Sequence, residues 1–422
     1  MTTDPNEDLY FACKNGDVDS VYSAIAHGAT DWNHGLFDAG VGGNIALVNM
    51  MIEHGATDWN KGLCGACCGG QREIVEMMFA HGATDLKWSL HNACRNGQVT
   101  IMEMLIARGA TEWDTGLWGA CFNGHVAIVE VMIAHGATNW NEGLIAACYN
   151  GYTEITKMMI AHGATNWNEG LYKACRGGHV AIVEVMVAQG AANWNDGLRA
   201  ACEGGHIELV NMMIEHGATG WNGSLRAACI GGHIEIVEMM IAHGATDWNG
   251  GLYVACFHGH VATAELMIAH GATDLDKGLI IACINKHKPI AELMIAHGAT
   301  KFDDGLYYAS RHGHFEITEL LIAHGVTNWD VACKYGKRNM KEYIKAQWKL
   351  HDAKAVPIIR MLRRCIVRLH STKRIQRWWR GTYPLWRELA YAPPNGVRYL
   401  QSLTHFEKNL NILKKIENSK KT

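Results

Sequence analysis

Cysteine and histidine are the residues whose chemistry and spacing first suggest a reactive or metal-binding site in this chain. Thiolates and imidazoles are the usual ligands of zinc, and two thiols can also pair as a disulfide. Ten of the 14 cysteines lie on one 27-residue stride: Cys13, Cys67, Cys94, Cys121, Cys148, Cys175, Cys202, Cys229, Cys256 and Cys283. One histidine series on that stride precedes a glycine: His27, His54, His81, His135, His162, His216, His243, His270, His297 and His324. A second series follows a glycine or a lysine: His125, His179, His206, His233, His260, His287 and His314.

The spacing of these series argues against both chemistries. Stacked helices lie roughly 8–10 Å apart, whereas a disulfide needs Cα atoms within about 7 Å. A zinc ion needs its ligand nitrogens at about 2.0–2.1 Å. Arg108 and Gln189 also replace histidine in the first series. We therefore predict buried packing cysteines and structural histidines, with no metal and no cofactor.

We expect the first histidine series to meet free carbonyls at helix C-termini. The second series should bond across repeats to loop backbone. Cys64, Cys67 and Cys68 crowd one repeat, but a lone Cys64-x-x-Cys67 without a second pair or nearby histidines is a weak zinc signal.

The elements that must position these residues repeat without an insertion. Gly28, Gly55, Gly82, Gly109, Gly136, Gly163, Gly190, Gly217, Gly244, Gly271, Gly298 and Gly325 are each 27 residues apart. A fixed period of this size predicts a solenoid in which each unit buries its apolar face against its neighbours. Both expected helices of a unit are shorter than the roughly 12–15 residues that an isolated helix needs.

Within one unit, we predict a first helix over Leu144–Tyr149, a glycine turn at Gly151, and a second helix like Val126–His135. Asn or Asp recurs at one position of the repeat, which lies three residues before the recurring leucine in the full repeats, and we expect it to cap the first helix. The recurring positions are Asn33, Asn60, Asp114, Asn141, Asn168, Asn195, Asn222, Asn249, Asp276, Asp303 and Asp330. Lys87 is the exception at this position, and Lys286 is the exception at the glycine turn. Exposed glutamates such as Glu130 should mark the outer side of the second helix.

Tryptophan occupies another recurring position: Trp32, Trp59, Trp113, Trp140, Trp167, Trp194, Trp221, Trp248 and Trp329. We favour a packing role in which each ring covers the loop and its N–H bonds to a backbone carbonyl. The alternative is an aromatic spine that anchors a partner, because tryptophan is enriched at binding hot spots.

The repeated pattern Leu-x-x-Ala-x-x-x-Gly-His-x-x-Ile-Val resembles the ankyrin repeat. Gly124–Glu130 and Gly232–Glu238 carry it most fully, and the resemblance covers about residues 6–348. It implies an all-α, ankyrin-like helical repeat solenoid of twelve full repeats plus a shortened thirteenth, Asn328–Trp348. It also implies a protein-binding, non-catalytic role.

The unit departs from the family in length, because the ankyrin repeat has about 33 residues. Six residues are missing between Gly136-Ala137 and Leu144, where the family places its projecting β-hairpin finger and its Thr-Pro-Leu-His turn. We therefore expect no fingers. These short repeats with Trp-Asn pairs are similar to those of ankyrin-type proteins of large DNA viruses of amoebae.

A basic segment follows the repeats. Residues 349–422 contain 17 Lys and Arg but 4 Asp and Glu, a net charge of about +13 against about −16 for the remainder. We predict an amphipathic helix over Val356–Arg380. Within it Ile375, Gln376, Trp378, Trp379 and Arg380 resemble half of a calmodulin-binding IQ motif, although Pro384 interrupts the second half.

Three roles remain open for this tail. It can cap the last apolar face of the solenoid, bind a partner helix or a calmodulin-like protein, or contact nucleic acid or an anionic membrane. We divide the chain into a solenoid, 1–348, and a basic helical segment, 349–422.

The sequence favours a monomeric scaffold or adaptor that binds a protein along one solenoid face. No phosphate loop, nucleophile elbow or catalytic carboxylate pair is present, so we expect no enzyme activity. Binding is expected at the variable position after the conserved leucine: Phe37, His91, Trp118, Ile145, Tyr172, Arg199, Arg226, Tyr253 and Tyr307. The alternative is a nucleic-acid- or membrane-associated protein tethered through its tail.

Cysteines kept as packing residues indicate a reducing compartment. Met1–Leu9 is polar and acidic, so we expect no signal peptide, and no apolar stretch reaches the length of a membrane span. The expected location is the cytoplasm, which would be that of the host cell if the chain is viral.

Overall fold

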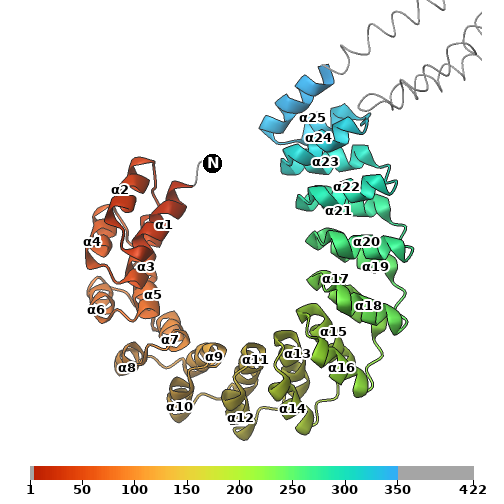
Figure 1. Cartoon of the computed structure of the whole chain (residues 1–422). Coiled ribbons are helices and arrows are strands. Elements are labelled where there is room, and N and C mark those ends of the chain that lie inside the picture. The colour runs from red at the N-terminus through yellow and green to blue at the C-terminus, as the bar shows by residue number, and fades with distance from the viewer. Residues whose placement is uncertain (1–3, 350–422) are drawn as a thin grey trace, which may run out of the picture. The chain divides into compact units, whose positions relative to one another are not determined.

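The computed structural model describes residues 4–349, and these residues are helical with short loops and no strand. The chain forms two compact units, residues 1–220 and 221–422, which are described one at a time. In each unit a first and a second helix alternate along the chain (Figure 1). The predicted all-α helical repeat architecture is confirmed.

The first unit consists of eight helix pairs. First helices contact first helices of neighbouring repeats and second helices contact second helices, which gives two layers. The pairs are α1 (Pro5–Asn15) and α2 (Val18–Ala26), α3 (Trp32–Gly42) and α4 (Ile45–Glu53), α5 (Trp59–Gly69) and α6 (Arg72–Ala80), α7 (Leu86–Arg95) and α8 (Val99–Ala107), α9 (Trp113–Asn123) and α10 (Val126–Ala134), α11 (Trp140–Asn150) and α12 (Thr153–Ala161), α13 (Trp167–Gly177) and α14 (Val180–Ala188), and α15 (Trp194–Gly204) and α16 (Ile207–Glu215).

The second unit repeats this arrangement and ends in a shortened repeat. Its helices are α17 (Trp221–Gly231), α18 (Ile234–Ala242), α19 (Trp248–His258), α20 (Val261–Ala269), α21 (Leu275–Asn285), α22 (Lys288–Ala296), α23 (Phe302–His312), α24 (Phe315–Ala323) and α25 (Trp329–Tyr335). A further helix spans residues 338–349. The predicted tail helix over 356–380 and its IQ-like residues lie outside the described residues.

The predicted start of the first helix was wrong by four residues. The helix begins at Trp140 rather than at Leu144, so Asn141 is its second residue and not its cap. The N-cap is the residue before the tryptophan, and in several repeats it is an aspartate. Asp58, for example, accepts a hydrogen bond from the Lys61 amide at 3.0 Å. An aspartate is a strong cap because its oxygen satisfies an amide that has no partner inside the helix.

The glycine turn closes the first helix as predicted. Gly178 has a φ of 83°, which is the left-handed conformation that closes helices at low cost for glycine. Lys286 takes the same conformation with a φ of 64° and is the one non-glycine residue among those described with a positive φ. The lysine therefore bears a steric cost that the other turns avoid.

The core is built from small residues in the first helix and larger ones in the second. Leu144, Ala147 and Cys148 are fully buried, and Val129 and Met132 are fully buried in the preceding second helix. A Cβ at Gly143 would lie 2.7 Å from the Met159 sulfur and 3.2 Å from the Cys121 sulfur. The glycine is required because neighbouring layers approach this closely.

The misassigned asparagine holds neighbouring repeats together. Asn168 Oδ1 accepts hydrogen bonds from the amides of Ala192, at 2.8 Å, and Asn193, at 3.0 Å. This pair of bonds, which we call the loop clamp, recurs at eleven positions: Asn6, Asn33, Asn60, Asp114, Asn141, Asn168, Asn195, Asn222, Asn249, Asp276 and Asp303. The clamp explains why the position accepts both Asn and Asp, since both supply a carbonyl or carboxylate oxygen.

The loop that follows each second helix is short, as the missing six residues predicted. Residues 135–139 connect α10 to α11, and no hairpin projects from any loop within residues 4–349. None of the helices within that range is long and apolar enough to cross a membrane. Because no hairpin projects within residues 4–349, the exposed surface of these repeats consists of helix faces and short loops.

Candidate protein-binding face

The recurring tryptophan is half-buried in most repeats and pairs with the first histidine series. Trp32 stacks on His54 with ring centroids 4.7 Å apart, and Trp194 stacks on His216 at 4.4 Å. Each pair joins the start of a first helix to the end of the second helix of the same repeat. The packing role of the tryptophans is therefore supported, although the contact partner was not foreseen.

The predicted hydrogen bonds of these residues are found in part. The indole N–H of Trp167 donates to the Ala164 carbonyl at 3.0 Å, in the repeat where Gln189 replaces the stacking histidine. His27 and His324 contact the Ser23 and Leu320 carbonyls through Nδ1, as expected for a helix C-terminus.

The second histidine series bonds across repeats, but its acceptors lie in helices and not in loops. His179 Nε2 lies 3.0 Å from the carbonyl oxygen of Tyr149, in the last turn of the preceding first helix. The same bond is made by His125, His206, His260, His287 and His314. Each histidine thus bonds to a carbonyl at the end of a first helix, where the carbonyl has no amide partner within that helix.

The ladder cysteines are buried and form no disulfide in the described part of the chain. Burial raises the pKa of Cys121 and of Cys148 to about 12. Cys64 and Cys68 are half-buried on α5, and burial raises both of their pKa values. No group of three or more metal-ligating side chains occurs within residues 4–349.

The variable positions after the conserved leucine lie on the layer of first helices. Arg199, Arg226 and Tyr253 are exposed, and Phe37, Trp118, Ile145, Tyr172 and Tyr307 are half-buried. His91 is an exception, because only 6% of its surface is exposed. The expected exposure of His91 was wrong, since the ring is covered by its aromatic neighbours. Its role in binding stays a prediction.

Those neighbours belong to a cluster of four contacting rings in the first unit. The His91 ring stacks on Trp118 at 5.4 Å and meets the edge of Trp88 at 5.5 Å, and Trp118 stacks on Phe122 at 5.1 Å. We call Trp88, His91, Trp118 and Phe122, from α7 and α9, the aromatic patch. Trp88 is 53% exposed, which is unusual for a side chain of this size.

Cations and a carbonyl oxygen hold the aromatic patch in place. The Arg95 guanidinium lies 4.9 Å from the Phe122 centroid, and Lys87 lies 5.9 Å from the Trp88 centroid. His91 Nδ1 lies 3.2 Å from the Thr115 carbonyl oxygen, and burial lowers the pKa of His91. The patch is thus a fixed apolar platform with positive charge at its edge.

The repeat that carries Trp88 and His91 departs from the others at its structural positions. Leu86 replaces the ladder tryptophan, Lys87 replaces the clamp asparagine and Arg108 replaces the stacking histidine, so this repeat makes neither the clamp nor the stack. Arg108 lies over Phe79 instead, at 4.2 Å. Departures from a consistent pattern concentrate at functional sites.

Sequence reasoning missed Trp88 and Phe122. Trp88 lies three residues before the variable position His91, and Phe122 lies four residues after the variable position Trp118. At these spacings each residue shares a helix face with its variable position. Trp88 and Trp118 are also tryptophans off the 27-residue ladder, which is the signal that could have identified the patch.

Smaller clusters occupy the same helix layer elsewhere. Arg199 lies 5.3 Å from the Tyr172 centroid and pairs with Asp196 at 3.3 Å. In the second unit, Tyr253 lines a cavity of about 220 Å³ together with Asp274 and Lys277. Tyr307 meets the edge of Tyr335 at 5.6 Å. The predicted residues therefore form separate local clusters on first helices.

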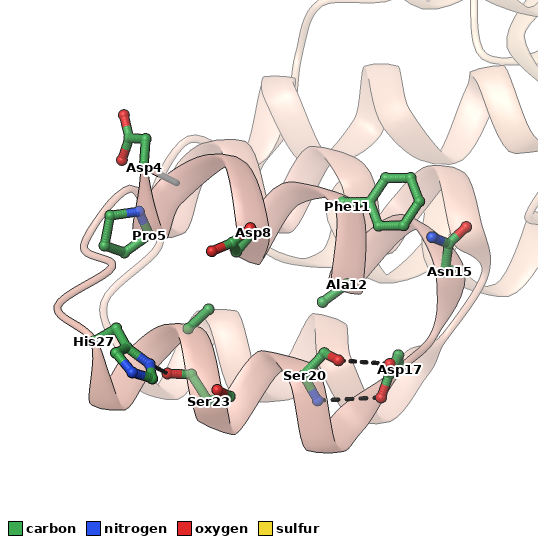
Figure 2. Close-up of a pocket in the computed structure, with 11 residues that line it drawn as sticks. Asp4, Pro5, Asp8, Phe11, Ala12, Asn15, Asp17, Ser20, Ser23 and His27 are labelled. Atoms are coloured by element: carbon green, nitrogen blue, oxygen red, sulfur yellow. Dashed lines mark hydrogen bonds between the residues drawn. The ribbon is translucent and has the colours of Figure 1, made fainter. Parts of the chain in front are cut away.

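A groove of about 830 Å³ separates α1 from α2 at the start of the first unit (Figure 2). Its lining includes Asp4, Asp8 and Asp17, and Phe11 at its edge is 73% exposed. The groove is both acidic and apolar, and no sequence argument singled it out.

Comparison with models of protein families agrees with this architecture. A family model described as ankyrin repeats, in three copies, matches residues 90–169, 117–197, 144–223, 198–278 and 252–332. Among solved structures, the ankyrin repeat domain of human ASB11 is similar, with 22% sequence identity, a TM-score of 0.32, and coverage of 43% of this chain and 96% of that chain. No curated protein matches the chain. Because the overlapping family matches extend over residues 90–332, more than half of the sequence, the chain belongs to the ankyrin-repeat family.

Proposed function

We propose that this protein is a non-catalytic scaffold or adaptor that binds a protein partner, with the aromatic patch as its main anchor. Ankyrin repeats generally mediate protein–protein interaction, which supports the general role. The observation that carries the specific proposal is the exposed Trp88 ring, which is linked to Trp118 through the His91 ring, in a repeat that has lost its clamp and its stack.

The chemistry of the patch suits an anchor. Tryptophan and arginine are enriched among residues whose truncation costs most of the binding energy. The platform is held by ring contacts and by Arg95, so little side-chain entropy is lost when a partner covers it. We infer that a partner side chain packs against Trp88 and that the exposed clusters at Tyr172 and Tyr253 add weaker contacts.

The test is affinity capture from source cells with full-length protein and two variants. Trp88→Ala should reduce recovery of at least one co-purifying protein by about tenfold or more, as expected for loss of a hot spot. Tyr22→Ala is the matched control, because Tyr22 is an exposed aromatic residue on a second helix. Equal recovery of every protein by wild type and Trp88→Ala would contradict the proposal.

The alternative role rests on the charge of the tail. With 17 basic and 4 acidic residues, residues 349–422 supply the electrostatics that nucleic acid or an anionic membrane would need. Binding of this kind would be lost at high salt, whereas capture through the aromatic patch would not.

Three further expectations belong to the same proposal. The protein acts in a reducing compartment, the cytoplasm, as a monomer. The 27-residue unit supports a relationship to the repeat proteins of large DNA viruses of amoebae, in which case the host cytoplasm is the site of action. The partner contacts the helix faces of this protein, because the β-hairpin fingers of the family are absent from the described repeats.

A further inference from the structure

The turns that join first to second helices carry a concentration of positive charge in the last repeats of the second unit. With their flanking residues, these turns are 257–260, 284–288, 311–315 and 334–338, which we call the basic edge. The basic edge contains six Lys or Arg residues, five histidines and no acidic residue. Residues 221–349 as a whole contain 12 Lys and Arg and 13 Asp and Glu, so the cations are segregated into these turns.

The four turns follow one another along one side of the unit. The first helices α19, α21, α23 and α25 pack in series (Figure 1). Each turn is also bonded to the preceding one: His287 Nε2 lies 3.0 Å from the Phe257 carbonyl oxygen, His314 Nε2 lies 3.0 Å from the Ile284 carbonyl oxygen, and the Lys337 amide donates to the Ser310 carbonyl at 3.1 Å. Because packed helices lie roughly 8–10 Å apart, the basic edge extends over roughly 24–30 Å.

Lys286 supplies a cation to the basic edge at a conformational cost. Its φ is 64°, whereas glycine takes the equivalent turn position in the repeats on either side, at Gly259 and Gly313. Folding does not require a lysine here, because glycine closes the same turn without strain. Residues that keep strained backbone conformations cluster at functional sites. The strain at Lys286 therefore indicates that its ammonium group has a function.

Lys286 and Lys337 bring two positive charges to the same turn. The Lys337 side chain lies over Gly313, where an added Cβ would be 3.0 Å from the lysine Cδ. Burial lowers the pKa of His314, and the charges of Lys286 and Lys337 lower it further. This turn is thus a place where like charges are held together, which favours an anionic ligand.

The cations of the basic edge differ in their pairing. Lys288 lies 3.9 Å from a Glu292 oxygen and 3.8 Å from a Glu316 oxygen, so its charge is partly neutralised. Lys286, Arg311 and Lys337 are exposed and form no ion pair within residues 4–349. Three positive charges are therefore available to a ligand.

Exposed aromatic rings alternate with these cations. Phe257 and Phe315 are each 44% exposed, and Tyr335 is 50% exposed with the Lys334 ammonium 5.1 Å from its ring centroid. Cations that follow a phosphate backbone, with rings on which bases stack, are the combination that binds single-stranded nucleic acid. An anionic membrane is a poorer match, because membrane-surface binding uses the continuous apolar face of an amphipathic helix, whereas the basic edge consists of turns. We propose that the basic edge binds a single strand of RNA or DNA.

In this arrangement Lys286, Arg311 and Lys337 contact phosphates, and the exposed rings stack on bases. At about 3.4 Å per nucleotide, a strand with stacked bases needs on the order of eight nucleotides to follow the edge. The site lies entirely within the second unit. It is separate from the aromatic patch on α7 and α9 and does not depend on the charge of residues 350–422.

The first test measures binding of the full-length protein to a fluorescein-labelled 20-nucleotide deoxythymidine strand by fluorescence polarisation over a series of salt concentrations. The triple variant Lys286→Gly, Arg311→Gln, Lys337→Gln should bind about tenfold or more weakly. The slope of log Kd against log salt should become smaller by about 2, because each lost phosphate contact removes about 0.7 for a single strand. Lys286→Gly alone relieves backbone strain, so a loss of affinity in that variant is not explained by unfolding.

The aromatic rings are tested with a matched pair of substitutions. Phe257→Ala should weaken binding about fivefold or more, whereas Phe257→Tyr keeps a ring that can stack and should bind like the wild type. A strand that carries 4-thiothymidine should crosslink under ultraviolet light to peptides that contain Phe257, Phe315 or Tyr335, as identified by mass spectrometry.

The control removes three exposed cations from the first unit, with Lys14→Gln, Arg72→Gln and Lys157→Gln. This variant should keep the wild-type affinity and salt slope. Three outcomes would overturn the proposal: a salt slope that the basic-edge triple variant leaves unchanged, crosslinks that fall only outside the basic edge, or binding to phosphatidylserine vesicles without binding to the strand.

Discussion

At the scale of single residues, the loop clamp is a side-chain hydrogen bond between repeats that recurs at eleven positions within residues 4–349. One asparagine oxygen satisfies two backbone amides that would otherwise need water, in a loop with no other secondary structure. We predict that Asn168→Ala destabilises the protein by about 1–2 kcal/mol, because a typical hydrogen bond contributes about 0.5–1.5 kcal/mol. Urea denaturation followed by circular dichroism measures the change in midpoint.

Lys87 allows the opposite change, in which a missing clamp is restored. Lysine cannot accept a hydrogen bond, and the loop at Thr111 and Glu112 therefore receives no clamp from this position. Lys87→Asn should restore it and raise the denaturation midpoint. A midpoint that rises with Asn168→Ala, or falls with Lys87→Asn, would show that the clamp is not stabilising.

Lys286 is a second single residue with a predictable effect. Its φ of 64° costs a lysine roughly 1 kcal/mol that a glycine does not lose. We predict that Lys286→Gly stabilises the second unit by about 1 kcal/mol. Gly259→Ala is the matched change in the opposite direction, because Gly259 has a φ of 83° and its Cβ would lie 2.7 Å from the His287 ring. The melting temperature should rise for Lys286→Gly and fall for Gly259→Ala.

At the scale of helices, the second histidine series joins the start of a second helix to the end of the first helix in the preceding repeat. Burial lowers the pKa of His314, with a further contribution from His312, Lys286 and Lys337. A histidine whose pKa is lowered in the folded state binds fewer protons than in the unfolded state. Stability is therefore complete above the unfolded pKa of about 6.5 and declines as the pH falls below it.

We accordingly predict a lower melting temperature at pH 5.5 than at pH 7.5. His91 adds to the effect, since burial lowers its pKa as well. His314→Gln should reduce the pH dependence while keeping the bond, because Gln98 makes the equivalent bond to the Cys68 carbonyl at 3.4 Å. An identical melting temperature at both pH values would contradict a role for neutral, buried histidines.

At the scale of the whole molecule, stability is distributed over repeats that contact only their neighbours. The labelling rate of each ladder cysteine can measure the local stability of one repeat, because each of these cysteines is buried in a different repeat. With a pKa of about 12, Cys121 and Cys148 hold almost no thiolate at pH 8. We predict that iodoacetamide labels the half-buried Cys333 about 100-fold faster or more than these two cysteines.

Labelling followed by peptide mass spectrometry also reveals the order of unfolding. In increasing urea, Cys94 should become reactive before Cys148, because Lys87 removes one clamp and Arg108 removes one stack in the repeat of Cys94. The repeat of Cys148 has both, since Asn141 makes the clamp and Trp140 lies against His162. Simultaneous labelling of all ladder cysteines would indicate that each unit unfolds as one cooperative body.

Much of the fold could be predicted from the sequence because it depends on local patterns. The 27-residue period, the glycine turn and the burial of Leu144, Ala147 and Cys148 follow from spacing and residue size alone. The start of the first helix could not be predicted in the same way. An Asn ahead of an apolar stretch is compatible both with a cap and with a helix position whose side chain reaches the next repeat.

The sequence by itself determined the repeat length, the helix pair, the absence of fingers in the described repeats and the type of residue at each buried position. Helix propensity, glycine conformation and side-chain volume are properties of short stretches of chain. Only the tertiary structure decided which side chains meet across repeats: the clamp, the Trp–His stacks, the covering of His91 and the exposure of Trp88. These contacts join residues about 22 to 30 positions apart, and their geometry depends on how closely two layers approach.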